Sequence, residues 1–408
     1  MKVLFLASYF PKPANPVMGT WALSQAQALA AQPDVELLVV SFTSQVPAFL
    51  ARSEGSKAYA DCPLEHEWEG GVKVLYPRWL YYPINPVKRW MYSNPMPYLA
   101  IAKLSAQKKL THIIDKFQPD VYFCHHSLPN GWLIANLPTA YQKPLFVLDH
   151  DYNEISDCRI FPSRYQAFSK VANKATALMA VSKRMEQDLK SLFPNANVFT
   201  HHNGITLPNP KIISQARPKE LQHKKIIVSC ALFAERKGIP LLIEAFAKVT
   251  PQHPNALLRI IGSGPDEDKI ENTIKQHKME SRVQLLGRKN HDDVLQEIAW
   301  SDFFALVGWD EPFATVYLES MAVGKAIICC DDGGINDVVE NGIQALTVPP
   351  RDTDATAIAL DKMLASPQKC HQMGGAAKSL INSSLTWHIK AEKLVKYFSA
   401  ALQKEKIH

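Results

Sequence analysis

Two glutamates set eight residues apart mark a part of this sequence where charged groups could act on a ligand. In DEPFATVYLESMAVGKAIICCDDGG, residues 310–334, Glu311 precedes a short apolar helical pattern and Glu319 lies inside it. The first amides of a helix lack intrahelical partners and attract anions, so the backbone of residues 313–315 predicts a seat for a phosphate. Glu311 could then reach a sugar joined to that phosphate. Glu319, one turn beyond Thr315 on the same face, could accept hydrogen bonds from ribose hydroxyls.

The same two charges also have an ordinary explanation. A glutamate just before a helix complements the helix dipole, and a glutamate inside a helix can simply face water. Spacing alone does not separate these interpretations, so the decision rests on the other polar turns of the chain.

Three further turns follow strand patterns and precede helical ones. Arg236, Lys237 and Gly238 follow an apolar run, and a lysine there could neutralise a diphosphate or could be plain surface charge. The glycines of residues 262–264 would let backbone approach a nucleotide, although the turn lacks the third glycine of a dinucleotide fingerprint. The segment 331–337 adds paired glycines and an aspartate. Each of these turns could be structural when taken alone.

The elements that must position these turns follow a repeating pattern. Short apolar runs alternate with amphipathic stretches, which predicts an α/β protein with parallel sheets covered by helices. Open sheets of this kind bind ligands at the carboxyl ends of their strands. The predicted strands are residues 3–8, 35–42, 72–76, 120–124, 144–149 and 177–182, and then 225–233, 255–264, 282–287, 302–308, 325–330 and 344–350.

The pattern divides the chain into two doubly wound, Rossmann-like domains. A length of 408 residues fits two domains of about 200 residues each. A polar, proline-containing stretch interrupts the alternation and predicts a linker, and the chain ends in an amphipathic helix with apolar residues on one side. We expect domains at 1–205 and 224–384, a linker at 206–223 and the C-terminal helix at 385–408.

Composition indicates a globular protein of a reducing compartment. Apolar residues make up 47% and charged residues 21% of the chain, with a net charge of +6. No apolar run reaches the roughly 18 residues of a membrane span. The seven cysteines are scattered without a disulfide framework. We therefore expect a cytoplasmic protein that suits anionic ligands and needs no nucleic acid partner.

Taken in their order, the motifs of the second half resemble the retaining glycosyltransferases of family 4, which have the GT-B fold. That fold has two Rossmann-like domains facing across a cleft, with a C-terminal helix packing back toward the first. The resemblance rests on Lys237-Gly238 with PLLIEAF, Gly262-Ser263-Gly264-Pro265, RVQLLG, Glu311-x7-Glu319 followed by SMAVGKAII, and DGGINDVVENG leading to VPPRD.

The resemblance implies that the second domain binds a nucleotide-sugar donor. Glu319 would hold the ribose, Lys237 the diphosphate, and the turn at Gly264 would lie near the nucleotide. Arg236 would also face the donor. The transferred sugar and the phosphates would contact Glu311 and the backbone of Phe313, Ala314 and Thr315.

The first domain would lie on the acceptor side. Its loop YFPKPANPVMGTW leads through Gly19 into a helix and resembles the glycine loop of the family, near the phosphates and the acceptor. A plain helix start is the alternative. His150, at the end of PLFVLD, matches a histidine that contacts the sugar in the family, although a lone histidine can also be structural.

The chain departs from the family pattern at three positions. Leu232 stands where an arginine is usual, Pro312 replaces the glycine after the first glutamate, and Asp337 replaces a glutamate after the paired glycines. Arg236 could compensate for Leu232.

The implied activity is transfer of a sugar from a nucleotide-diphosphate sugar to an acceptor hydroxyl with retention, in cell-surface polysaccharide or glycoconjugate synthesis. No metal or cofactor is expected, because Lys237 and the helix start at residues 313–315 could stabilise the leaving diphosphate and no metal-binding aspartate motif stands out. The pairs His125-His126 and His201-His202 lack a second ligand at metal-site spacing and are expected to be structural. Two alternatives remain. A nucleotide-sugar epimerase could share the architecture, and Leu232 would suit a non-catalytic nucleotide-sugar binder.

The acceptor is not defined by the sequence. The segment 76–110 mixes aromatic residues with Arg78, Lys88 and Arg89 and could rest on an anionic membrane, at the inner face of which a lipid-linked saccharide would be available. The alternative is a loop of the acceptor cleft or a helix packed on the core.

Overall fold

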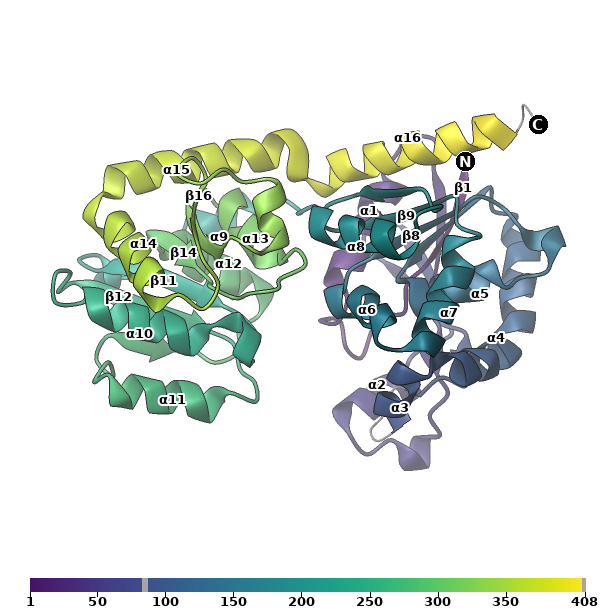
Figure 1. Ribbon diagram of the computed structural model, residues 1–408, viewed down its shortest axis with the longest axis horizontal. Helices are drawn as coiled ribbons and strands as arrows, with labels where there is room; N and C mark the ends of the chain where they lie inside the picture. The colour runs from purple at the N-terminus through teal and green to yellow at the C-terminus, as the bar shows by residue number, and fades with distance from the viewer. Residues whose placement is uncertain (83–86, 406–408) are drawn as a thin grey trace. The chain divides into compact units, whose positions relative to one another are not determined.

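The computed structural model describes residues 1–82 and 87–405 of the chain (Figure 1). Two predictions extend beyond these residues. Positions 83–86 of the aromatic and basic segment 76–110 lie outside the described part, and so do positions 406–408 at the end of the expected C-terminal helix.

The described residues form two compact units. Unit 1 comprises Met1–Asn203 together with the C-terminal segment that begins at Trp387, and unit 2 comprises Gly204–Thr386. Each unit has its own sheet and its own buried apolar core. The segment predicted as a linker contains the short helix α9 (Pro210–Ile213), which packs against unit 2.

Unit 1 is built on a predominantly parallel sheet. Within the described residues its strands are β1 (Lys2–Leu6), β2 (Glu36–Val40), β4 (Glu65–Trp68), β5 (Val72–Leu75), β7 (Val121–His125), β8 (Leu145–Asp149), β9 (Ala177–Ala180) and β10 (Val198–Thr200). They lie in the order β10-β9-β8-β7-β1-β2-β5-β4, with only β4 antiparallel to its neighbour. A separate parallel pair is formed by β3 (Thr43–Ser44) and β6 (Arg78–Trp79).

Helices cover both faces of this sheet, so its central strands read as continuous apolar runs. Every residue of β7 and β8 is buried. The helices are α1 (Thr20–Ala30), α2 (Glu54–Ala60), α3 (Val87–Ser93), α4 (Pro95–Phe117), α5 (Trp132–Ala135), α6 (Tyr152–Ser156), α7 (Pro162–Ala172), α8 (Lys183–Leu192) and α16 (Trp387–Glu405).

Unit 2, all of whose residues are described, has a fully parallel sheet. Its strands are β11 (Lys225–Cys230), β12 (Ala256–Ile261), β13 (Val283–Leu285), β14 (Phe303–Ala305), β15 (Ile327–Cys330) and β16 (Ala345–Val348), in the order β13-β12-β11-β14-β15-β16. The connecting helices are α10 (Ile239–Val249), α11 (Glu267–Gln276), α12 (His291–Trp300), α13 (Thr315–Ala322), α14 (Thr353–Ala365) and α15 (Pro367–Leu380).

The helices of unit 2 form two layers around its sheet. Helix α10 contacts α11 and α14, whereas α13 contacts α12 and α15 (Figure 1). Strand order reverses next to β11, which lies between β12 and β14. In unit 1 the same reversal occurs at β1, between β2 and β7. Each reversal creates a switch point where an open α/β sheet can bind a ligand.

The C-terminal helix completes the core of unit 1. Leu394 and Phe398 of α16 are fully buried, and the Phe398 ring lies 4.8 Å from the ring of Phe146 in β8. Helix α16 also packs on α1 (Figure 1). The prediction that this helix returns to the first domain is confirmed.

The predicted α/β fold class is confirmed, with differences at short elements. Each predicted strand overlaps an observed one, but β4, β10 and the two-residue strands β3 and β6 were not predicted. Strand β4, EHEW, is polar and joins β5 through the turn at Gly70 and Gly71, and β10 has three residues at a sheet edge. The helix expected from residue 313 begins at Thr315 instead.

A pair of adjacent glycines in α15 tests the packing of unit 2. A Cβ on Gly374 would lie 2.1 Å from the carbonyl oxygen of Gly324, whereas a Cβ on Gly375 would meet nothing within 4 Å. Gly374→Ala should therefore lower the free energy of unfolding by about 1–3 kcal/mol. Gly375→Ala should raise it by up to about 1 kcal/mol, because alanine favours helix. Urea unfolding of both variants checks this, and equal effects would contradict the packing.

Candidate active site

The switch point of unit 2 holds a close pair of opposite charges. Lys237, after β11, has its Nζ 2.6 Å from Oε1 of Glu311, after β14, and these side chains are 15% and 4% exposed. Nη1 of Arg236 lies 3.8 Å from the same oxygen. An ammonium has three N–H donors, so Lys237 can pair with Glu311 and still bind an anion.

Glycines allow the loops that carry this pair to touch. Gly238 has a φ of +65° and a Cβ there would lie 2.4 Å from the carbonyl oxygen of Val307. A Cβ on Gly308 would lie 3.0 Å from the carbonyl oxygen of Arg236, which accepts a hydrogen bond of 2.9 Å from the amide of Trp309. The position of Lys237 beside Glu311 therefore depends on backbone contacts that larger residues would block.

The loop after β15 joins the same group. The amide of Gly334 donates to the carbonyl oxygen of Glu311 at 2.9 Å, and the Asp332 carboxylate accepts from the amide of Asp310 at 3.1 Å. Loops from three adjacent strands thus fix the backbone around Glu311.

Of the departures from the family pattern, Leu232 is 57% exposed and lies in the loop that follows β11.

Helix α13 starts beside this group, two residues later than the sequence predicts. Ala314 is its N-cap residue, with no side-chain cap, so the first-turn amides belong to Thr315 and Val316. Phe313 precedes the cap, and its side chain is buried. The hydroxyl of Tyr317 donates to the carbonyl oxygen of Leu306 at 2.7 Å, which fastens the first turn to the end of β14.

Glu319 lies one turn deeper and contacts a histidine. Its Oε1 is 3.4 Å from Nε2 of His291, and this carboxylate is the main cause that raises the pKa of His291. At the end of β11, burial raises the pKa of the Cys230 thiol to about 12, with Glu319 raising and Lys237 lowering it. Cys230 therefore lies within electrostatic range of both predicted donor-binding charges.

The glycine turn after β12 packs on the loop after β11. A Cβ on Gly264 would lie 2.4 Å from the carbonyl oxygen of Phe233, and the amide of Phe233 donates to Ser263 at 3.0 Å. Gly262 has a φ of +142°, and a Cβ there would come still closer to the carbonyl oxygen of Ala231. These contacts place Gly264 at the switch-point edge of the sheet.

In unit 1, Gly19 is the N-cap residue of α1. It has a φ of +81°, and a Cβ would lie 2.4 Å from the carbonyl oxygen of Tyr9. The loop after β1 and the start of α1 are thereby held together at the switch point of unit 1. Gly19 and His150 belong to unit 1, whereas the other predicted site residues belong to unit 2.

His150 belongs to a cluster of histidines rather than standing alone. Its ring centroid lies 4.4 Å from that of His125 and 5.4 Å from that of His126. Burial lowers the pKa of His150 well below its ordinary value, and the neighbouring histidines His126 and His201 lower it further. His150 is therefore neutral near pH 7.

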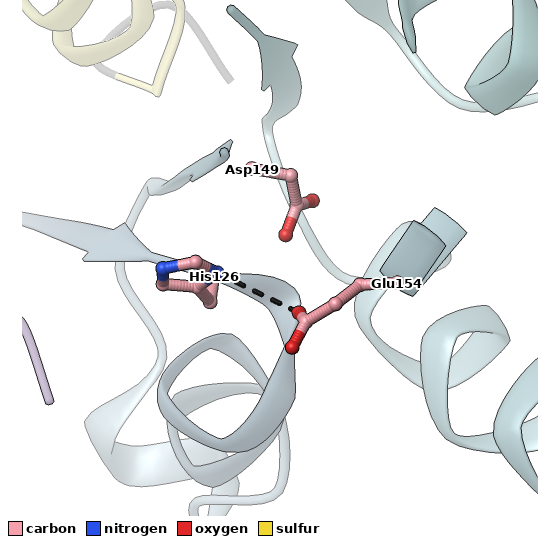
Figure 2. Close-up of side chains that lie close together, drawn as sticks. All are labelled: His126, Asp149 and Glu154. Carbon is pink, nitrogen blue, oxygen red and sulfur yellow. Dashed lines mark ion pairs between the residues drawn. The ribbon is translucent and has the colours of Figure 1, made fainter. Parts of the chain in front are cut away.

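A buried polar cluster was missed by the sequence analysis. His126, Asp149 and Glu154 converge from the ends of β7 and β8 and from α6, as Figure 2 shows, and their donor atoms lie within 4.8 Å of one another. The sequence spacing around His126 did not indicate these two carboxylates, which lie 23 and 28 residues further along the chain. Since β7 and β8 are adjacent parallel strands, His126 and Asp149 could have been expected at one edge. The Asp-x-x-Glu helix start at Asp151 could have placed Glu154.

The groups around this cluster fit a metal ion poorly. The Asp149 carboxylate already accepts from the amide and hydroxyl of Ser127, at 2.6 and 2.7 Å. Glu154 Oε2 lies 3.6 Å from His126 Nδ1 and 3.7 Å from Arg164 Nη2. The guanidinium of Arg164 supplies positive charge where a metal ion would need to sit, so the two cations would repel each other.

The segment 76–110 supplies β6, α3 and much of α4. Outside positions 83–86, it leaves Trp90, Ile101 and Leu104 exposed by 53%, 46% and 82%. None of the helices in the described residues is long and apolar enough to cross a bilayer. Membrane contact by this segment stays a prediction.

Comparison with known proteins defines first the class and then the family. Sucrose-phosphate synthase from Thermosynechococcus elongatus aligns at a TM-score of 0.78 and 17% identity over 99% of this chain and 100% of its own. HepE from Anabaena, solved in complex with UDP, aligns at 0.71 and 17% identity over 98% and 100%. These likenesses establish the GT-B fold.

Sequence comparison gives the family. Residues 18–207 match the family described as Glycosyltransferase Family 4, and residues 211–380 match Glycosyl transferases group 1. The chain therefore belongs to the family 4 glycosyltransferases, as the motifs predicted. Glycogen synthase of Mycobacterium tuberculosis is 25% identical over 301 residues, 71% of each chain.

The pairing of His126 with Glu154 makes a prediction about titration. Burial lowers the pKa of His126, but the carboxylates of Glu154, Asp149 and Asp151 together raise it more, so the net pKa is raised. This raised pKa stabilises the fold below the ordinary value of about 6.5 and the contribution is lost as pH rises through the folded pKa. In Glu154→Gln the pKa of His126 should fall, because the variant removes the carboxylate that contributes most to raising it.

NMR titration of the histidine Cε1 protons measures this change directly. Glu36→Gln, an exposed glutamate of the same unit, is the matched control and should leave the His126 titration unchanged. An unaltered His126 pKa in Glu154→Gln would show that the two groups do not interact.

Proposed function

We propose that the chain transfers a sugar from a nucleotide-diphosphate sugar to an acceptor hydroxyl with retention of anomeric configuration, without a metal ion or cofactor. Unit 2 would bind the donor and unit 1 the acceptor. A role in cell-surface polysaccharide or glycoconjugate synthesis follows from the family resemblance. The observation that carries the proposal is the convergence of Lys237, Glu311 and the start of α13 at the switch point of unit 2.

The proposed reaction places negative charge where this group can stabilise it. As the bond between the anomeric carbon and the diphosphate breaks, charge develops on the leaving phosphate oxygen. Lys237 and the amides of Thr315 and Val316 would stabilise that charge, and preorganised donors of this kind each contribute about 3 kcal/mol in a dry site. The acceptor oxygen bonds to the anomeric carbon from the same face, and its proton passes to the leaving phosphate.

Glu311 and Glu319 would have separate roles in donor binding. Glu311 is buried beside the ammonium of Lys237, so it would both position that cation and accept a hydrogen bond from the transferred sugar. Glu319, held by His291, would accept from the ribose hydroxyls. A nucleotide-diphosphate donor is supported by the similar HepE, whose structure contains UDP. A polysaccharide product is supported by the similar glycogen synthase.

One observation favours a second candidate, a nucleotide-sugar binder without activity. Leu232, which stands at the usual arginine position, offers no charge to a phosphate, and its 57% exposure shows that no packing role requires leucine there. Arg236 reaches Glu311 from the same loop and would supply the missing charge in an active enzyme. Binding of a donor without hydrolysis or transfer would favour the inactive candidate.

Removal of the Lys237 ammonium should act mainly on turnover. Lys237→Ala should lower kcat for hydrolysis or transfer of a labelled nucleotide sugar by about 100- to 1000-fold, because charge stabilisation is lost chiefly in the transition state. Arg236 remains near Glu311, so the fold should persist, as thermal unfolding can verify. The assay contains EDTA, since the proposed reaction uses no metal ion.

The matched control is Lys248→Ala, which removes an exposed lysine of α10 that pairs with Asp354. Its kcat should equal that of the unmodified protein. Equal kcat values in Lys237→Ala and Lys248→Ala, or activity abolished by EDTA, would contradict the proposed chemistry.

Removal of the Glu319 carboxylate should act mainly on donor affinity. A hydrogen bond to a charged group is worth about 1.5–3 kcal/mol, so Glu319→Ala should weaken nucleotide-sugar binding by about 10- to 100-fold. Isothermal titration calorimetry measures the change. Glu271→Ala, an exposed position on α11, is the control. The ribose assignment fails if Glu319→Ala and Glu271→Ala bind the donor equally well.

A further inference from the structure

Unit 2 contains a polar cavity at the edge of its sheet opposite to the proposed donor site. Lys237 and Glu311 lie in the loops that follow the carboxyl ends of β11 and β14. The cavity lies where the same strands begin, because its lining includes Lys225, the first residue of β11, and Phe303, the first residue of β14. Its volume is about 160 Å³, and one water molecule needs about 10–15 Å³ of such space. This amino-edge cavity therefore has room for a small polar ligand.

Three cationic side chains line the amino-edge cavity. They come from separate parts of the chain, since Arg217 precedes β11, Lys225 begins it and Lys325 precedes β15. Among the lining residues, Asp302 supplies the one carboxylate. Apart from the exposed His371, the charged side chains of the lining thus carry an excess of two positive charges.

Both lysines keep hydrogen-bond donors for a ligand. Nζ of Lys325 donates to the carbonyl oxygen of Ser301 at 2.6 Å, and Nζ of Lys225 donates to that of Leu364 at 2.7 Å. An ammonium has three N–H donors, so each lysine can bind an anion in addition to its carbonyl partner. Both lysines are half-buried, which restricts how far their charges are screened by water.

The helix ends at the cavity do not cancel its positive charge. Ser301 ends α12 and Leu364 lies in the last turn of α14, so the two lysine bonds also cap helices. A helix carries about half a unit of negative charge at its carboxyl end and half a unit of positive charge at its amino end. The cavity lies at the carboxyl ends of α12, α13 and α14 and at the amino end of α15. Together these ends offset about one of the two excess positive charges.

The carboxylate of Asp302 compensates the cations only in part, because it already has other partners. Its Oδ2 accepts from the amide of Ile226 at 2.6 Å, and its Oδ1 lies 3.3 Å from Nη2 of Arg217. Burial lowers the pKa of Lys325, and Arg217 lowers it further, against the raising effects of Asp302 and Cys370. A bound anion would supply the negative charge that Lys325 lacks.

The charge and the arrangement of the donors favour a phosphate group over other anions. A phosphate carries about −1.5 to −2 charges at pH 7 and presents at least three acceptor oxygens, whereas a carboxylate brings one charge on two oxygens. Arg217, Lys225 and Lys325 can donate to separate oxygens because they approach from different elements. The first turn of α15, which no side chain caps, lies at the same cavity through Pro367 and Cys370. Its amides also favour negative charge.

We propose that the amino-edge cavity binds a phosphate group, as inorganic phosphate or as a phosphomonoester, through Arg217, Lys225 and Lys325. This site is separate from the proposed donor site, since the two lie at opposite edges of one parallel sheet. The inference does not depend on the proposed glycosyltransferase function.

³¹P NMR of the full chain tests the proposal. The transverse relaxation of inorganic phosphate is measured at increasing protein concentration and constant ionic strength, because salt screens the cations. UDP is present in excess to occupy the donor site, and its phosphorus signals are resolved from that of phosphate. The protein should broaden the phosphate signal. Displacement by glucose 6-phosphate at lower concentration than by inorganic phosphate identifies a phosphomonoester site, and equal displacement identifies a site for the free ion.

Variants assign the binding to the cavity. Lys325→Met and Lys225→Met keep the length of the side chain but remove its charge, and each should weaken phosphate binding about 10-fold, the loss expected for a hydrogen bond to a charged group. Asp302→Asn removes the competing negative charge and should tighten binding about 3- to 10-fold. Lys275→Met, at an exposed position of α11, is the control and should leave binding unchanged. Opposite effects of the lysine and aspartate variants cannot arise from a shared loss of stability.

Lys237→Ala separates this site from the donor site and should bind phosphate as tightly as the unmodified protein. No binding by the unmodified protein, unchanged binding in both lysine variants, or no tightening in folded Asp302→Asn would overturn the proposal. Loss of phosphate binding in Lys237→Ala would also overturn it, because the anion would then lie at the donor edge. None of these results alters the proposed transfer reaction, which the kcat of Lys237→Ala tests independently.

Discussion

The geometry of the proposed donor site in unit 2 depends on one buried ion pair between Lys237 and Glu311. A carboxylate that is 4% exposed is costly unless a cation compensates it. Here the loop after β11 brings that cation by packing against the loop after β14. Gly238 and Gly308 permit this contact because neither has a Cβ. The pair holds the Lys237 ammonium at the edge of the sheet where α13 begins. The same arrangement therefore compensates the buried carboxylate and provides a site for an anion.

The two units use one architecture for different chemistry. In unit 2 the strand ends present a lysine, an arginine and helix amides, a set that favours phosphate. In unit 1 they present the rings of His126 and His150, with the Glu154 carboxylate beside His126. Both sets stand at switch points of open sheets, so the fold accounts for where the ligands bind and the side chains account for which ligands.

The sequence was sufficient for much of the fold because its strands are apolar runs of the length that parallel sheets require. Elements without that pattern were missed, such as the polar strand β4 and the three-residue strand β10. At the site, Lys237 and Glu311 could be predicted because each lies in the loop that follows a strand. The partnership of Glu154 with Arg164 could not, since it joins α6 to α7 across ten residues through side-chain packing that no local pattern encodes. The sequence analysis started α13 at Phe313, because this residue fits the apolar helical pattern. The backbone becomes helical only at Thr315.

A crystal structure of the chain with UDP is the most direct measurement of the central claim. The account predicts that the diphosphate oxygens contact Lys237 Nζ and the first-turn amides of α13, with the ribose hydroxyls within hydrogen-bond distance of Glu319. Density for UDP at any other edge of the unit 2 sheet, or a diphosphate without contact to Lys237 and α13, would contradict it.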